Sequence, residues 1–162
     1  MTNLRETRNH LYCQKALDME SIARGVYLSL GEMLYKIREE RLYEPFWSSW
    51  AEYCMEFKDF SQGSISKMIA VYEVFVLKYG YSVDELSKAG GWTKLYALTP
   101  HIKSKKDADK WLKIAGEQTR TDLGRSLVEA KTGISMSDCK HKNSHVIRIC
   151  DDCGVKVIEH EK

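Results

Sequence analysis

The stretch "SISKMIAVYEVFVLKYG", residues 64–80, decides the fold because its apolar residues recur every three or four positions. The positions that share one face are Ile65, Met68, Ile69, Tyr72, Phe75 and Val76. This spacing places their side chains along one side of an α-helix, which must then pack against other elements. Gly80 follows the last apolar position, where glycine commonly ends a helix. The stretch therefore predicts a helix that belongs to a helical core.

The same spacing continues on both sides of this stretch. Upstream, residues 19–42 predict a long amphipathic helix with the apolar positions Ile22, Val26, Leu30, Leu34 and Ile37, widened by Tyr27 and Met33. Before it, residues 4–18 predict a shorter helix with Leu4, Leu11, Tyr12 and Ala16 inward. Residues 45–57 place five residues at helical spacing, namely Phe46, Trp50, Tyr53, Cys54 and Phe57. The expected fold is mainly α.

Further helices are expected downstream, each opened by a polar cap. Ser82 and Glu85 fit a capping box, and Ser104 and the Thr119/Asp122 pair begin two later helices that run to Gly116 and Gly133. The predicted apolar positions of these two helices are Ala108, Trp111, Leu112, Ala115, Leu123, Leu127 and Val128.

The last part of the chain has a different pattern. Apolar and polar residues alternate in "HVIRIC" (145–150) and "VKVIEH" (155–160), on either side of "DDCG". Alternation with a tight turn between predicts a small β-hairpin. We therefore expect a multi-helix body over residues 1–133 and a separate small module over residues 134–162.

Cysteine and histidine in this module form two closely spaced pairs. The favoured ligand set is Cys139, His141, Cys150 and Cys153, with His145 or His160 as alternatives to His141. Thiolate and imidazole ligands suit tetrahedral Zn²⁺, and four protein ligands leave no open position for catalysis. A segment this short cannot form a hydrophobic core of its own. Binding of structural zinc would therefore supply the free energy that folds it. A redox pair is the less favoured reading, because such pairs usually begin a helix.

The composition and net charge of the chain limit the classes of function that are expected. The chain has 162 residues, 43% of them hydrophobic and 30% charged, with a formal net charge of +2. These values are typical of a globular protein, and no apolar run reaches the roughly 20 residues of a membrane span. The first ten residues lack a signal peptide's apolar stretch, so a cytoplasmic protein with no membrane role is expected. The near-neutral charge means that any nucleic-acid contact must come from a local patch.

Residues 46–79 have the order of a helix-turn-helix, whose second helix presents its N-terminal side chains to DNA. The side chains predicted to contact DNA are Ser61, Gln62, Ser64, Ser66 and Lys67, which are short polar or basic groups suited to phosphates and base edges. Gly63 permits close backbone approach. The same residues also make an ordinary helix cap, which is the plain structural alternative.

The stretch "FSQGSISKMI" (60–69) resembles the helix-turn-helix of the ParB/KorB group of plasmid and phage partition and repressor proteins. The longer stretch "LGEMLYKIREERLYEPFWSSWAEYCMEF" is similar to small phage and mobile-element proteins, and the tail resembles a minimal zinc ribbon. The resemblance implies a transcription regulator or partition-like protein. Two features depart from the group: the turn is longer than that of simple repressors, and the segment that binds nucleotide in full partition proteins is missing. No CTPase activity is therefore implied.

The expected function is that of a non-enzymatic protein that binds duplex DNA, acting as a homodimer in the cytoplasm of a host cell if phage-encoded. No glycine-rich phosphate loop, serine elbow or HExxH motif points to an enzyme. The alternative is a phage-encoded protein-binding inhibitor or adaptor that acts on a host nucleoprotein or enzyme. The aromatic residues Phe46, Trp47, Trp50 and Tyr53 favour this alternative, since aromatic side chains are common interface anchors. Trp47 lies off the predicted apolar stripe, so either it is exposed or this helix is buried on two sides.

Overall fold

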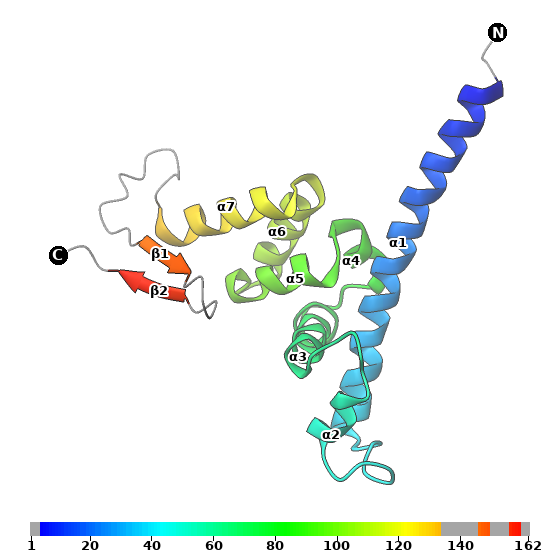
Figure 1. Cartoon of the computed structure of the whole chain (residues 1–162). Coiled ribbons are helices and arrows are strands. Elements are labelled where there is room, and N and C mark those ends of the chain that lie inside the picture. Colours follow the sequence, from blue (N-terminus) through cyan, green and yellow to red (C-terminus); the bar gives the residue numbers. More distant parts are fainter. Residues whose placement is uncertain (1–3, 134–145, 150–155, 160–162) are drawn as a thin grey trace. The chain divides into compact units, whose positions relative to one another are not determined.

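The computed structural model describes residues 4–133, 146–149 and 156–159 (Figure 1). Contacts between Cα atoms divide the chain into two units, Met1–Leu127 and Val128–Lys162, and each is described by itself. The division falls within a helix, before the boundary predicted after residue 133.

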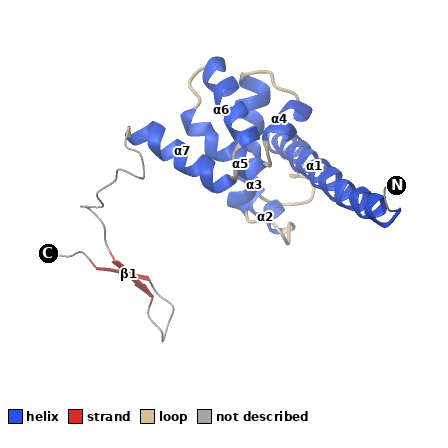
Figure 2. Ribbon diagram, turned by 90° about the horizontal axis from the view of Figure 1, so that it is seen from above, coloured by secondary structure: helices blue, strands red, loops and turns tan. Residues whose placement is uncertain are grey.

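The chain is mainly helical, as the spacing of its apolar residues predicts (Figure 2). The α-helices are α1 (Leu4–Glu39), α2 (Trp50–Met55), α3 (Gln62–Val71), α4 (Val83–Ala89), α5 (Trp92–Leu98), α6 (Lys105–Glu117) and α7 (Arg120–Thr132). A π-helical segment, Tyr72–Lys78, continues α3 directly, and a short 3-10 helix, Thr99–His101, follows α5. In the part of the chain that the structure describes, no helix is long and apolar enough to cross a bilayer.

The helix over residues 62–78 lies at the centre of the core, as predicted from its sequence. Ile65, Met68, Ile69, Tyr72 and Phe75 are all buried. Ile65 and Ile69 belong to one apolar cluster with Leu34 and Cys54, and Phe75 belongs to a larger one with side chains of α4 to α7. Gly80 ends the segment with a φ of 74°, and the amide of Tyr81 bonds back to the carbonyl of Phe75 at 3.0 Å. Glycine adopts such a positive φ without strain.

The sequence prediction for α1 is wrong in two respects. The chain forms one continuous helix where two were expected. In addition, most of the predicted apolar face does not pack: Ile22 and Val26 are exposed and Leu34 alone of the predicted positions is buried. The face that contacts α3 instead contains Leu28, Gly31 and Leu34. Leu11, Tyr12 and Ala16, which were expected inward, are exposed.

The region around α2 also differs from expectation. The helix begins at Trp50, because the hydroxyl of Ser49 accepts a hydrogen bond from the amide of Glu52 and caps it there. Phe46 therefore precedes the helix and is exposed rather than buried. Of the two readings left open for Trp47, burial is the nearer: it is half-buried against Tyr53 at 4.9 Å between ring centroids, and its Nε1 donates to Glu56.

The later helices begin where their caps predict. Ser82 with Glu85, and Ser104 with Asp107, form complete capping boxes at α4 and α6. The predicted inward residues of α6 and α7 are buried or half-buried, except Val128, which is exposed.

In the second unit, β1 (Val146–Ile149) and β2 (Lys156–Glu159) pair antiparallel. The paired residues are Val146 with Glu159, Ile147 with Ile158, Arg148 with Val157 and Ile149 with Lys156. Residues 150–155, which connect the strands, lie outside the described part of the chain.

Candidate nucleic-acid interface

The N-terminus of α3 is built by two serines. Ser61 is the N-cap, and its Oγ accepts a hydrogen bond from the amide of Ser64 at 3.1 Å. The two hydroxyl oxygens of Ser61 and Ser64 lie 3.0 Å apart. Both hydroxyls are therefore engaged within the protein, where they fix the conformation of this turn. Of the five residues predicted to contact DNA, these two serve first as structural groups.

The other three predicted residues are exposed on α3. The hydroxyl of Ser66 donates to the backbone carbonyl of Gln62 at 2.9 Å, which leaves its oxygen free to accept. Gln62 and Ser66 are four positions apart, so their side chains lie on one face of the helix. Within the described residues, the Gln62 amide has no hydrogen-bond partner and remains available to a ligand.

Lys67 is exposed beside this face, on the side of α3 that is turned toward α5. Its Nζ lies 5.6 Å from the ring centroid of Tyr96 in α5, within the range of a cation–π contact. Within the described residues, its ammonium group forms no salt bridge, so its charge is not neutralised by the protein. We call Gln62, Ser66 and Lys67 the exposed face of α3.

The backbone beside this face is open. Gly63 is exposed, and the nearest atom to a Cβ built there is the Ser61 hydroxyl oxygen at 3.7 Å. The absence of a side chain lets another molecule approach the helix axis closely.

The electrostatic environment of the α3 N-terminus favours an anion. The first turn contains no acidic residue, and unpaired amides at a helix N-terminus carry partial positive charge. Further along the same helical rod, the carboxylate of Glu73 is paired with Arg38 of α1 at 2.7 Å. Glu73 is the acidic residue nearest to Lys67 within residues 62–78, and its negative charge is offset by this ion pair.

The support beneath the face is rigid. Ile65, Met68 and Ile69 are almost completely buried, and α1 approaches the backbone of α3 at Gly31. A Cβ built at Gly31 would lie 2.8 Å from the carbonyl oxygen of Met68. Such close packing holds the direction in which the exposed side chains project.

A second exposed surface lies near α2. Leu42, Phe46 and Met55 expose between 52% and 79% of their area. The neighbouring Cys54 is buried, and burial raises the pKa of its thiol, so it acts as an apolar packing group.

The predicted zinc ligands Cys139, His141, Cys150 and Cys153, and the alternatives His145 and His160, lie outside the described residues. In the described part of the chain, no group of three or more His, Cys, Asp or Glu side chains is placed to hold a metal ion.

Comparison of the chain with models of protein families, with curated proteins and with solved structures finds no match.

Proposed function

We propose that this chain is a non-enzymatic DNA-binding protein in which the exposed face of α3 contacts duplex DNA. The observation that carries the proposal is that Gln62 and Lys67 project from the capped N-terminal part of a buried helix. Among the residues that the structure describes, no hydrogen bond satisfies the Gln62 amide and no ion pair neutralises Lys67. This placement is typical of recognition helices, whose N-terminal side chains reach base edges in the major groove.

Each residue has a distinct part in the proposal. The Lys67 ammonium would neutralise a phosphate, and the Gln62 amide has the donor and acceptor pair that suits adenine. The oxygen of Ser66 would accept from a base or a water. Ser61 and Ser64 would present the first amides of the helix to a phosphate, because their own hydroxyls hold that turn in place.

The resemblance of residues 60–69 to the ParB/KorB group favours a regulator or partition-like protein of a phage or mobile element, acting in the host cytoplasm. A homodimer is part of this proposal, since a single helix-turn-helix buries little surface on DNA.

Salt dependence tests the proposal. Binding to a random-sequence duplex, followed by fluorescence anisotropy, should weaken steeply between about 50 and about 200 mM salt. Lys67→Ala should reduce the slope of log K against log salt by about one unit. The matched control is Lys88→Ala, because Lys88 is already paired with Asp84 at 2.6 Å. Equal effects of the two substitutions, or no binding at low salt, would refute the proposed interface.

The second part of the proposal is that Zn²⁺ holds together the small module over residues 134–162. Three thiolates and an imidazole form a donor set that suits tetrahedral zinc, in a segment too short for a core of its own. The purified chain should contain about one zinc per chain, and Cys150→Ser should lose most of it. Cys13→Ser, which removes an exposed cysteine of α1, should leave the zinc content unchanged. Metal analysis of the three proteins decides the matter.

An adaptor or inhibitor that binds a host nucleoprotein or enzyme is the alternative. The exposed apolar side chains of Leu42, Phe46 and Met55 support it, because aromatic and methionine side chains anchor many protein interfaces. Phe46→Ala would then abolish capture of a partner while Lys67→Ala would not.

A further inference from the structure

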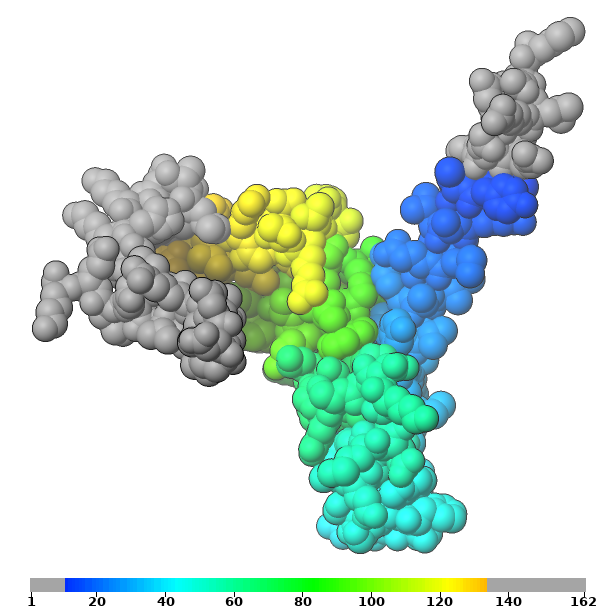
Figure 3. Space-filling model, in the orientation of Figure 1, coloured from blue at the N-terminus to red at the C-terminus, as the bar shows by residue number. Residues whose placement is uncertain are grey.

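The N-terminal half of α1 has no covering element in its own unit. Every residue from 11 to 23 is exposed, and this part of the helix extends away from the rest of the unit (Figure 3). A helix of this length is marginally stable in water without packing. Nevertheless it carries large apolar side chains, among them Tyr12, Met19 and Ile22.

The exposed apolar side chains of α1 follow a seven-residue repeat. Tyr12, Met19, Val26 and Met33 are seven positions apart, and each exposes more than half of its area. A repeat of seven is the signature of a helix that pairs with another helix, and these four positions span three repeats, which reach the length of a short coiled-coil seam. We call these residues, with Ile22, the outer stripe. It lies on a different side of α1 from Leu28, Gly31 and Leu34, whereas Leu30, at its edge, packs on the cluster with Ile65 and Ile69 of α3.

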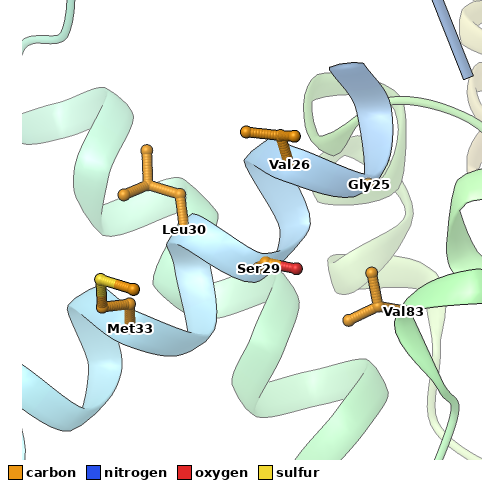
Figure 4. Close-up of a pocket in the computed structure, with 6 residues that line it drawn as sticks. All are labelled: Gly25, Val26, Ser29, Leu30, Met33 and Val83. Atoms are coloured by element: carbon orange, nitrogen blue, oxygen red, sulfur yellow. The ribbon is translucent and has the colours of Figure 1, made fainter. Parts of the chain in front are cut away.

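The middle of the outer stripe contains a groove of about 470 Å³ (Figure 4). Gly25 and Ser29 form its floor, and the larger side chains of Val26, Leu30 and Met33 border it, together with Val83 of α4. A Cβ built at Gly25 would meet no atom within 4 Å, so the space is open to another molecule.

We propose that two copies of this chain pair antiparallel through the outer stripe, with the two-fold axis passing between Val26 and Ser29. Val26 then faces Ser29 of the second copy, and Ser29 faces its Val26. The two-fold axis repeats this contact, so that a larger side chain meets a smaller one at two places, as a self-complementary interface requires. Met33 faces Ile22 of the second copy, so that apolar contact continues on both sides of the groove.

The charges at the two ends of the stripe fit the same alignment. Lys15 and Glu40 lie in the stripe's face near its two ends, and within the described residues neither forms a salt bridge. In the proposed pairing, Lys15 of each copy faces Glu40 of the other. A parallel pairing would place Lys15 against Lys15 and Glu40 against Glu40, so charge favours the antiparallel arrangement.

The pairing also covers the extended half of α1. From Lys15 to Glu40 the helix rises about 38 Å, and in the antiparallel arrangement the first half of each helix lies along the second half of its partner. Tyr12 then approaches the exposed Leu42 of the second copy. The inference deepens the dimer within the proposed function and names its surface; it does not depend on DNA contact.

Mass measurement in solution tests the pairing. Analytical ultracentrifugation of the full chain, without DNA, should show twice the 18.7 kDa of one chain at high concentration. Val26→Glu should give the single-chain mass under the same conditions. The matched control is Leu17→Glu, at a site of nearly equal exposure on the same helix but off the outer stripe, and it should remain dimeric. A wild-type chain that is monomeric throughout, or equal dissociation by both substitutions, would overturn the proposal.

The charge pair tests the orientation. Lys15→Glu and Glu40→Lys should each raise the dissociation constant of the dimer by about threefold to tenfold, and the double substitution should restore it. Unchanged dissociation in the single variants would overturn the antiparallel register. Because no DNA is present, failure of this interface and failure of the proposed DNA contact are separate results.

Gly25→Leu provides a check against misfolding. Leucine is a better helix former than glycine by about 1 kcal/mol, and its side chain has open space in the single chain. The variant should therefore keep its helix content by circular dichroism and yet dissociate, because the leucine fills the groove beside Ser29, which Val26 of the second copy faces. A variant that keeps wild-type dimerisation would contradict the proposed groove contact.

Discussion

At the scale of the residue, Gly31 makes a sharp prediction about the contact between α1 and α3. A methyl group there would lie 2.8 Å from the carbonyl oxygen of Met68, and a backbone atom cannot rotate away. Gly31→Ala should therefore destabilise the protein by about 1–3 kcal/mol through overpacking, less the gain of about 1 kcal/mol in helix propensity.

Urea denaturation measures this change, and Gly124→Ala is the matched control. Gly124 is an exposed position of α7 where a Cβ meets no atom within 4 Å, so alanine should raise stability by up to about 1 kcal/mol there. A gain in stability at both positions would show that the two helices do not approach closely at Gly31.

Tyr81 predicts a dependence of stability on alkaline pH. Its hydroxyl donates to the carboxylate of Asp109, and burial, followed by this hydrogen bond, raises the pKa of the phenol. Above about pH 10 an unfolded tyrosine loses its proton, whereas folded Tyr81 keeps it. The unfolded state then binds fewer protons, so the free energy of unfolding falls as pH rises beyond that point. Tyr81→Phe should make this fall shallower, and parallel curves for the two proteins would contradict the assignment.

At the scale of the element, the capping box of α6 should contribute measurably to stability. Ser104 accepts from the amide of Asp107 at 3.2 Å, and the carboxylate of Asp107 accepts from the amide of Ser104 at 2.9 Å. Ser104→Ala should cost about 1 kcal/mol by thermal or urea unfolding. Ser21→Ala, an exposed substitution inside α1, should instead leave stability unchanged or raise it slightly. Equal effects would mean that the cap contributes nothing.

The elements differ in how far the sequence predicts them. The core face of α3 and the π-helical segment after it is predictable because they share one apolar stripe, from Ile65 to Phe75. The caps of α4 and α6 are predictable because local hydrogen bonds set them. The packed face of α1 is not, because that helix has two apolar stripes, and periodicity does not say which one meets the core. The small residue Gly31 was the missed signal, since a close helix crossing needs a residue without a side chain.

The candidate site is predictable only in part for a related reason. The sequence indicates which residues begin α3, but the structure separates their tasks: the hydroxyls of Ser61 and Ser64 cap the helix, whereas Gln62 and Lys67 project outward. Hydrogen bonds between side chains one turn apart depend on rotamers, which spacing alone does not specify.

At the scale of the whole molecule, the two proposed surfaces lie on different helices, the outer stripe on α1 and the exposed face on α3. Leu28, Gly31 and Leu34 hold α3 against α1 and are not part of the outer stripe. Pairing through the outer stripe therefore leaves the exposed face of α3 uncovered by the contact between the two helices. One chain can then take part in a dimer and contact DNA at the same time.

This arrangement predicts a link between dimerisation and the salt dependence of DNA binding. A dimer neutralises phosphates with two copies of Lys67 and of the α3 N-terminus, whereas a single chain has one of each. Because the slope of log K against log salt is proportional to the number of neutralised phosphates, Val26→Glu should give a slope about half that of the wild-type dimer. Fluorescence anisotropy titrations at several salt concentrations, with Leu17→Glu as the dimeric control, measure it. An undiminished slope in a chain shown to be monomeric would mean that the dimer does not contact DNA through both of its α3 helices.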